Sequence, residues 1–294
     1  MSVSLRDRVI VVTGAADGIG NATALGLAAE GAALVLGYFD ASQLGALRSH
    51  FGEEPRVTFV RADVRDVTAV EALGRHAVAT FGRVDAVVNC AGVVIPGRID
   101  STPAEHIARQ LDTNLGGTIN VARAFIPHFK QQGAGHLVLI ASLAGMVPLP
   151  SESIYAASKF AVRGFAHSIA YELKGTGVAV TVVCPDSTRT RMLEIECGDE
   201  GSSLSFASAA MEPADVARAI IGALKRPRLE VTVPGLRGRL IRWLGAMPTI
   251  FHWLYPFIDA TGQRRKARYR QRLHSRRIRS GLFGRVIAPN PVEP

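Results

Sequence analysis

The sequence has few cysteines, and they form no metal-binding or disulfide pattern. Its 294 residues include Cys90, Cys184 and Cys197, with no CxxC pair and no Cys/His cluster. Three thiols at these spacings make neither a zinc site nor a disulfide scaffold, so we expect no metal and a reducing, cytoplasmic location. Residues 1–20 lead directly into an apolar run and a glycine-rich stretch, and they lack the layout of a signal peptide.

Long apolar runs are also lacking. The longest nearly apolar stretch, 243–258, is shorter than the roughly 20 residues of a membrane-spanning helix, and Pro248, His252 and Pro256 interrupt it. A hydrophobic content of 48% is nevertheless ample for a sizeable core. The length allows one large domain or two small ones.

Acidic residues are scarce near the C-terminus. The net charge is +9, but residues 225–294 carry 16 Lys and Arg against 3 Asp and Glu, a balance of +13. Residues 1–224 therefore carry 18 basic against 22 acidic side chains, a balance of −4. Any argument about acidic partners is confined to the C-terminal end of the chain.

Short apolar runs alternate with segments of helical composition along most of the chain. Runs typical of buried parallel strands lie at 9–13, 33–38, 57–61, 84–88, 136–141, 178–184 and 229–233. The segments between them include helices predicted to end near residue 30 and to cover 41–51, 66–81 and 213–225. This order predicts an α/β fold, with a single Rossmann-type, doubly wound parallel sheet over 1–235 and a basic, amphipathic extension over 236–294.

Two of the predicted helices begin with capping signals. Asp66 is placed as the N-cap of the helix that ends at 81. Residues 102–105, Thr-Pro-Ala-Glu, form a capping box with proline at the first helical position, which predicts the start of a long helix containing Asn114. Asparagine is unfavourable inside a helix, so Asn114 has either a local role or a solvent-facing side chain.

A glycine-rich turn, TGAADGIG at 13–20, follows the first predicted strand. The first glycine permits a tight turn, and the later ones let a ligand approach a helix N-terminus, where free N–H groups favour phosphate. The spacing is G-x-x-x-G-x-G, and an ordinary glycine-rich turn is the alternative. The order of strand, loop and helix favours a dinucleotide site. Its candidate residues are Gly14, Asp17, Gly18, Ile19 and Gly20.

The end of the second strand indicates which dinucleotide is expected. An acidic side chain there favours the ribose 2′-hydroxyl of NAD, whereas a cation favours the 2′-phosphate of NADP. Residues 37–40, Gly-Tyr-Phe-Asp, contain no cation, and Asp17 and Asp40 are acids nearby, which together tilt the choice between NAD and NADP towards NAD. Asp40 could instead cap the next helix. Tyr38 is a candidate contact, as are Asp63 and Val64, where the carboxylate could accept from an adenine amino group.

Small residues follow the fourth strand, in Asn89-Cys90-Ala91-Gly92. Their size would let the backbone lie flat against a bound cofactor, so Ala91 and Gly92 are candidate contacts. Asn89 suits direct cofactor contact and an inter-strand hydrogen bond equally well.

Ser142, Tyr155 and Lys159 form a candidate catalytic group. Tyr155 and Lys159 are four residues apart, so on a helix they lie one turn apart on the same face. An ammonium near a phenol lowers the phenol pKa from about 10 towards neutral, which makes tyrosine usable in proton transfer. Ser142 lies at a strand end, where its hydroxyl could bind a substrate oxygen. A chance pairing, with the lysine on a solvated face, is the alternative.

Together these motifs resemble the short-chain dehydrogenase/reductase family over residues 5–235. The resemblance rests on TGAADGIG, Asp63, NCAG at 89–92, Asn114, Ser142 and Tyr155-x-x-x-Lys159 in the family's order. It implies that Tyr155 is the general acid/base and that Ser142 polarises the substrate oxygen. It further implies that Lys159 lowers the pKa of Tyr155 and binds the nicotinamide ribose, and that Asn114 holds a water that links Lys159 to solvent.

The chain departs from the family after the sixth strand, where the family usually has Pro-Gly. Here the run is Pro185-Asp186-Ser187-Thr188-Arg189-Thr190. Backbone contacts near Pro185 and Thr188 and a phosphate contact from Thr190 are still expected. Residues 186–212 lack a regular pattern, and a loop of this length usually serves as a lid or binding segment.

The C-terminal extension combines apolar and basic side chains. Residues 236–258 alternate basic and large apolar groups and include both tryptophans, and 264–279 are densely basic. This combination suits peripheral contact with a membrane surface through 236–279. The extension could equally cover the substrate site or pack on a partner subunit. Nucleic acid is the least supported partner, because no recognised motif accompanies the charge.

The expected activity is hydride transfer between NAD or NADP and a lipophilic secondary alcohol or ketone. The apolar residues of 186–212 and of the extension motivate the substrate class. The alternative is a non-catalytic dinucleotide-binding protein whose basic tail contacts a membrane or nucleic acid. The family resemblance also implies a homo-oligomer.

Overall fold

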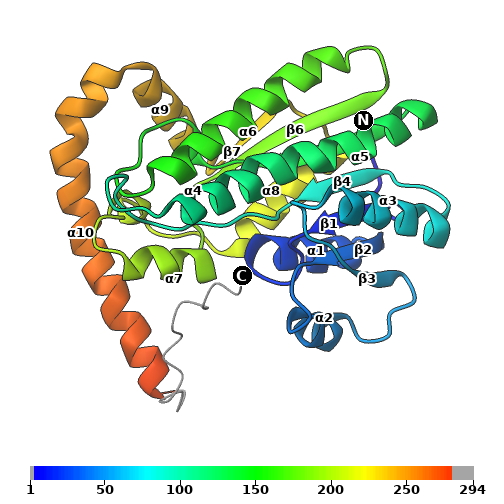
Figure 1. Ribbon diagram of the computed structural model, residues 1–294, viewed down its shortest axis with the longest axis horizontal. Coiled ribbons are helices and arrows are strands. Elements are labelled where there is room, and N and C mark those ends of the chain that lie inside the picture. Colours follow the sequence, from blue (N-terminus) through cyan, green and yellow to red (C-terminus); the bar gives the residue numbers. More distant parts are fainter. Residues whose placement is uncertain (1–2, 280–294) are drawn as a thin grey trace.

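A computed structural model describes residues 3–279 and shows a seven-stranded, entirely parallel sheet (Figure 1). The strands are β1 (Val9–Thr13), β2 (Ala33–Tyr38), β3 (Val57–Arg61), β4 (Ala86–Asn89), β5 (Gly135–Ile140), β6 (Val178–Pro185) and β7 (Glu230–Val233). Their order in the sheet is β3-β2-β1-β4-β5-β6-β7. The direction of winding reverses between β1 and β4, which is the Rossmann arrangement and confirms the predicted fold class.

Helices cover both faces of this sheet. The helices up to β7 are α1 (Gly18–Ala29), α2 (Gln43–Phe51), α3 (Val67–Phe81), α4 (Ala104–Leu111), α5 (Gly117–Gln132), α6 (Ser153–Glu172), α7 (Arg191–Gly198) and α8 (Pro213–Lys225). Helices α3, α5 and α6 enclose one apolar core, and α1 and α8 enclose the other. The five inner strands are buried on both sides, which is why their sequences are nearly continuous apolar runs, whereas the edge strands β3 and β7 are only partly buried.

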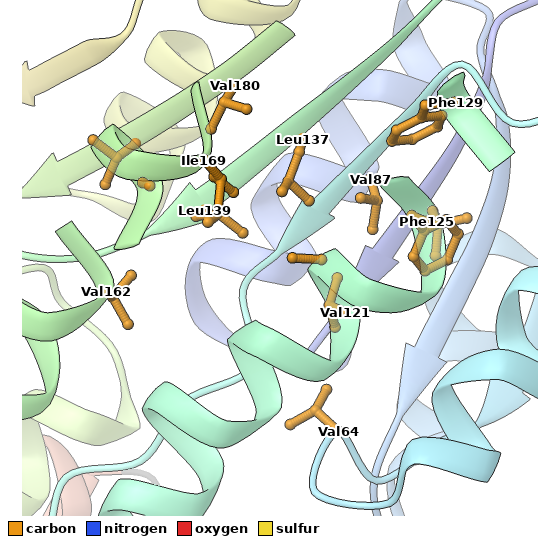
Figure 2. Close-up of a cluster of buried hydrophobic side chains, with 14 of the residues drawn as sticks. Val64, Val87, Val121, Phe125, Phe129, Leu137, Leu139, Val162, Ile169 and Val180 are labelled. Atoms are coloured by element: carbon orange, nitrogen blue, oxygen red, sulfur yellow. The ribbon is translucent and has the colours of Figure 1, made fainter. Parts of the chain in front are cut away.

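An apolar core packs α5 and α6 against one face of the sheet. Figure 2 shows Phe125 and Phe129 of α5 packed beside strand residues of this core, including Val87 and Leu137. All four side chains are fully buried or nearly so. Burying a large apolar side chain contributes about 1.5–3 kcal/mol, so this packing holds the helices firmly in place against the sheet.

The capping signals have different outcomes. Asp66 is the N-cap of α3, and its carboxylate accepts from the amides of Thr68 and Ala69, as predicted. The capping box at 102–105 is wrong, because Pro103 occupies the N-cap and the Thr102 hydroxyl instead donates to the Arg98 carbonyl at 2.7 Å. The long helix containing Asn114 is confirmed, with one irregularity: the backbone stays helical from Ala104 to Gln132, but a π-helical turn, Asp112–Gly116, lies between α4 and α5.

The segment expected to be irregular contains α7 and a short 3₁₀ turn, Leu204–Phe206. Beyond β7 the extension folds into α9 (Gly235–Ala246) and α10 (Pro248–Arg279), which lie along one side of the molecule (Figure 1). Proline at the first position of α10 suits a helix start. Within 3–279, no helix is both long enough and apolar enough to cross a bilayer.

Candidate active site

The glycine loop lies at the carboxyl edge of the sheet, where β1 and β4 end side by side. Gly14 has a φ of +60°, and a Cβ there would lie 2.8 Å from the backbone nitrogen of Ala91. A Cβ on Gly20 would overlap the Gly14 carbonyl. The carboxylate of Asp17 accepts from the Gly18 amide at 2.6 Å and caps α1. The loop therefore needs its glycines to fold closely onto β4 beside the N-terminus of α1.

Asn89 is a structural residue in this arrangement. Its carboxamide accepts from the Thr13 hydroxyl at 2.5 Å and donates to the Thr118 hydroxyl at 2.9 Å. The side chain is buried and ties β1, β4 and α5 together. Of the two roles open for Asn89, the structure shows the inter-strand one.

Asn114 points into the protein from the π-helical turn. Its side chain accepts from the Val93 amide at 2.8 Å and donates to the Val93 carbonyl at 2.9 Å and the Ser158 hydroxyl at 3.0 Å. It is fully buried, so the solvent-facing alternative is wrong. A Cβ on Gly92 would lie 3.2 Å from Asn114 Oδ1 and 3.5 Å from Lys159 Nζ. Asn114 and Lys159 therefore flank the same glycine.

One cavity of about 370 Å³ is lined by Ser142, Tyr155 and Lys159. The Lys159 ammonium lies 5.6 Å from the centre of the Tyr155 ring and donates to the Ile140 carbonyl at 3.0 Å. Ser142 begins a 3₁₀ turn, Leu143–Gly145, and hydrogen-bonds Tyr155. Lys159 and Tyr155 are both buried, so the solvated-lysine alternative is wrong.

The pKa of Tyr155 differs from the sequence-based expectation. Burial raises the pKa of Tyr155, Glu196 and Glu152 raise it further, and the hydrogen bond with Ser142 lowers it. Burial lowers the pKa of Lys159 to about 8. The expected lowering by Lys159 is not what the structure shows, because desolvation and two nearby acids oppose the phenolate. At neutral pH the site therefore holds Tyr155 as a phenol that can donate a proton.

Glu152 and Glu196 form a buried acidic pair that the sequence analysis missed. Glu152 precedes α6, Glu196 comes from α7, and the Ser205 hydroxyl lies 3.3 Å from an oxygen of each carboxyl. Burial raises the pKa of both carboxyls, and Glu152 raises that of Glu196 further. The one sequence signal for this pair was Glu152, three residues before Tyr155.

Asp186, which stands at the family's glycine position, pairs with the extension. Its carboxylate accepts from the Arg237 guanidinium of α9 at 2.6 Å and from the Ser208 hydroxyl at 3.1 Å. The Thr188 hydroxyl donates to the Asp186 carbonyl at 2.9 Å. The departure from the family pattern and the additional helices are therefore parts of one structural arrangement.

The cavity wall beyond the polar triad is mainly apolar. It includes Leu143, Val147, Leu149, Met192, Leu193, Leu204, Leu240, Ile241, Leu244, Phe251 and Ile258. The last five belong to α9 and α10, so the extension covers the cavity, one of the alternatives left open. Leu244 and Phe251 are buried against Val147.

A sequence model of the short chain dehydrogenase family matches residues 8–199. The chain belongs to this family. An uncharacterized oxidoreductase of Staphylococcus aureus is 34% identical over 224 residues, which cover 76% of this chain and 94% of the relative. A short-chain dehydrogenase/reductase from Burkholderia phymatum, solved in complex with NAD, is 27% identical with a TM-score of 0.75, covering 82% of this chain and 93% of its own. ElxO, solved with NADP bound, shares the fold at 23% identity and a TM-score of 0.70, over 77% and 97% of the two chains.

The residues at the carboxyl edge of the sheet fit a nicotinamide dinucleotide. The glycine loop leaves no room for a Cβ at Gly14 or Gly20 and sets the N-terminus of α1 beside the ends of β1 and β4. A Cβ on Gly18 would lie 2.9 Å from a Thr190 methyl, so the loop after β6 faces the glycine loop. Ile19, Gly92, Pro185, Thr188 and Thr190 line the same cavity as the triad. These residues would hold the pyrophosphate and nicotinamide portions of the dinucleotide.

Arginines that the sequence analysis did not anticipate lie near the end of β2. The Arg65 guanidinium lies 5.6 Å from the centre of the Phe39 ring and pairs with Asp63 at 2.7 Å. Arg61 donates to the Phe39 carbonyl at 3.2 Å. Asp40 accepts from the Ser42 amide at 2.7 Å, but the N-cap of α2 is Ser42, so Asp40 is not the cap of that helix. Residues 37–40 contain no cation because the nearby arginines come from a later part of the sequence, so the missing cation no longer favours NAD.

Tyr38, Asp63 and Val64 lie apart from the triad. They do not line the cavity. The side chains of Tyr38 and Val64 are buried, and the Asp63 carboxylate is engaged by Arg65. Their predicted cofactor contacts stay predictions.

Proposed function

We propose that this dehydrogenase interconverts a lipophilic secondary alcohol and its ketone, with Tyr155 as the general acid/base. The observation that carries the proposal is a largely apolar cavity with Ser142, Tyr155 and Lys159 at its polar wall. When bound, a nicotinamide dinucleotide supplies or accepts the hydride. Ser142 would bind the substrate oxygen, and Tyr155 would deliver a proton to that oxygen in reduction and remove it in oxidation. Lys159 and Asn114, on either side of Gly92, would serve proton exchange with solvent.

The substrate class is tested with a series of methyl ketones and secondary alcohols of increasing chain length. An apolar cavity should raise kcat/KM by up to about fourfold per added methylene, because each buried methylene contributes about 0.8 kcal/mol. Nicotinamide absorbance reports the rates. Leu240→Gln, at a half-exposed cavity residue, should flatten the dependence, and Leu229→Gln, outside the cavity, should not. A wild-type dependence that is flat, or that favours polyols, would refute the substrate class.

The buried acids predict the pH dependence of alcohol oxidation. Because the pKa of Tyr155 is raised, the phenolate forms only in the alkaline range, so kcat/KM for oxidation should rise with pH. Glu196→Gln removes a negative charge that opposes the phenolate and should move the rise to lower pH. Glu194→Gln, an exposed acid on the same helix, is the control and should leave the profile in place. An unchanged profile in Glu196→Gln would contradict the assignment.

Several expectations about the wider setting stay predictions. The cofactor is NAD or NADP, since Arg61 and Arg65 could accommodate a 2′-phosphate and the relatives solved with cofactor contain one or the other. A homo-oligomer and a cytoplasmic location rest on the resemblance and the cysteine content. The alternative, a non-catalytic dinucleotide-binding protein, would be favoured if the cofactor bound but no hydride transfer occurred with any ketone or alcohol of the series.

A further inference from the structure

Large apolar side chains are concentrated on the outer side of α9 and α10 and at Met247 between them. They are Leu236, Leu240, Trp243, Met247, Ile250, Trp253, Leu254 and Phe257. Trp253 and Phe257 are 75% and 74% exposed, as much as side chains of a solvated helix. Large exposed apolar patches rimmed by polar groups mark interaction surfaces. We call these eight residues the apolar face of the extension.

Arginines continue this surface along α10. Phe257 follows Trp253 by four residues. The exposed Arg264 and Arg268 follow Trp253 by 11 and 15 residues. At 100° per residue these four side chains lie within about 60° of one another on the helix surface. The opposite side is buried, with Phe251 against Val147 and Lys266 near Phe206. The exposed side of α10 is therefore apolar and aromatic near its start and basic further along.

The inner faces of the same two helices close the catalytic cavity. Ile241, Leu244, Phe251 and Ile258 line it, and Leu240, which is 56% exposed, belongs to both the cavity wall and the apolar face. The cavity wall thus continues onto the apolar face at Leu240. Arg237 also joins α9 to Asp186 beside the cofactor site, so the extension is tied to the cavity at two points.

We propose that the apolar face and the α10 arginines dock on the surface of an anionic lipid bilayer, and that the substrate enters the cavity from that bilayer. Tryptophan and phenylalanine are suited to the boundary between headgroups and acyl chains, and arginines add attraction to anionic headgroups. Only the origin of the substrate rests on the proposed function. The proposed docking on the bilayer is argued from the exposed apolar and basic side chains alone.

Two other occupants fit this surface less well. A second copy packed through the same face would bring together two segments of strong positive charge, because residues 225–294 carry a balance of +13. Nucleic acid would engage the arginines but would leave Trp253, Phe257 and Leu236 exposed to water. An anionic bilayer matches both the apolar and the basic part of the surface.

The test is co-sedimentation of the full chain with vesicles. One set is phosphatidylcholine alone, and the other is phosphatidylcholine and phosphatidylserine in equal parts. Wild type should bind the anionic vesicles, and added salt should weaken the binding. Trp253→Gln combined with Phe257→Gln should weaken it by about tenfold or more, since each side chain loses buried apolar area. Tyr171→Gln, at a 73% exposed aromatic residue on α6, is the matched control and should bind as wild type does.

A second pair of variants separates charge from apolar contact. Arg264→Gln combined with Arg268→Gln should lower affinity for the anionic vesicles by about tenfold or more, at roughly fivefold per arginine, and should have little effect on phosphatidylcholine vesicles. No binding of wild type to anionic vesicles, or unchanged binding of the Trp253/Phe257 variant, would overturn the docking. A change in oligomer size in that variant, without vesicle binding by wild type, would assign the face to a second copy.

Turnover of a short, water-soluble ketone without vesicles tests the proposed ketone reduction separately from the proposed docking on a bilayer. Trp253 and Phe257 do not line the cavity, so their variant should retain this activity. If vesicle binding is found and no ketone is reduced, the proposed function fails and the docking stands. If a long-chain ketone held in vesicles is reduced equally well by the wild type and by the non-binding variant, delivery from the bilayer is refuted.

Discussion

Replacing Tyr155 with phenylalanine should lower kcat/KM for both directions of the reaction by about 100- to 10,000-fold, the usual contribution of a general acid/base. The substitution removes only the hydroxyl, which hydrogen-bonds Ser142, and leaves the buried ring in place. The Kd of the cofactor should change little, because the glycine loop and the β6 loop are untouched. Nicotinamide fluorescence measures both quantities on the same samples.

The control for this variant lies on the same helix. Tyr171→Phe changes a tyrosine that is 73% exposed near the end of α6 and should keep wild-type activity. Thermal unfolding of the two variants shows whether the Tyr155 site still folds. A folded Tyr155→Phe protein that turns over ketone at the wild-type rate would remove Tyr155 from the mechanism.

Gly14→Ala should lower cofactor affinity by about tenfold or more. The φ of +60° costs a residue with a Cβ roughly 1–2 kcal/mol, and the added atom would lie 2.8 Å from the Ala91 backbone. Since about 1.4 kcal/mol corresponds to tenfold in affinity, the strain alone is of that size if the loop must adopt this conformation to bind the dinucleotide. Displacement of the loop from β4 adds to the loss. Titration of nicotinamide fluorescence gives the Kd.

A glycine elsewhere tests whether the effect belongs to the loop. Gly45 lies in α2, and a Cβ there would meet no atom within 4 Å, so Gly45→Ala should bind cofactor normally. Equal cofactor affinity in Gly14→Ala and wild type would show that the tight turn is not part of the binding site.

The sheet was predictable because parallel strands are buried on both faces and therefore appear as apolar runs. β1, β2 and β3 have the predicted ends, whereas β4 begins two residues later and ends at Asn89, the polar residue that joins β1 to α5. The π-helical turn at 112–116 within the predicted long helix was not predictable, because the buried Asn114 in that turn hydrogen-bonds residues 93 and 158, which are distant in sequence. Helix propensity depends on local sequence and does not report contacts between residues that are distant along the chain.

The triad was predictable because its spacing is local, four residues on one helix. The features around it depend on distant residues. Glu196 approaches Tyr155 from α7, and Arg237 reaches Asp186 from 51 positions along the chain. Arg61 and Arg65 come to the end of β2 through the pairing of Tyr38 with Arg61. Tertiary structure alone brings these charges together. This is why the pKa of Tyr155 differs from the expectation and why the missing cation near Tyr38 was no sufficient ground for preferring NAD.

The central claim is that this site moves a hydride to a substrate carbon while Tyr155 supplies the proton. The most direct measurement uses cofactor deuterated at nicotinamide C4, mixed with wild type or Tyr155→Phe and the ketone series, with products analysed by mass spectrometry. We expect deuterium at the carbinol carbon of a long-chain product with wild type and nearly none with Tyr155→Phe. Cofactor binding without deuterium transfer to any ketone, or equal transfer by both proteins, would contradict it.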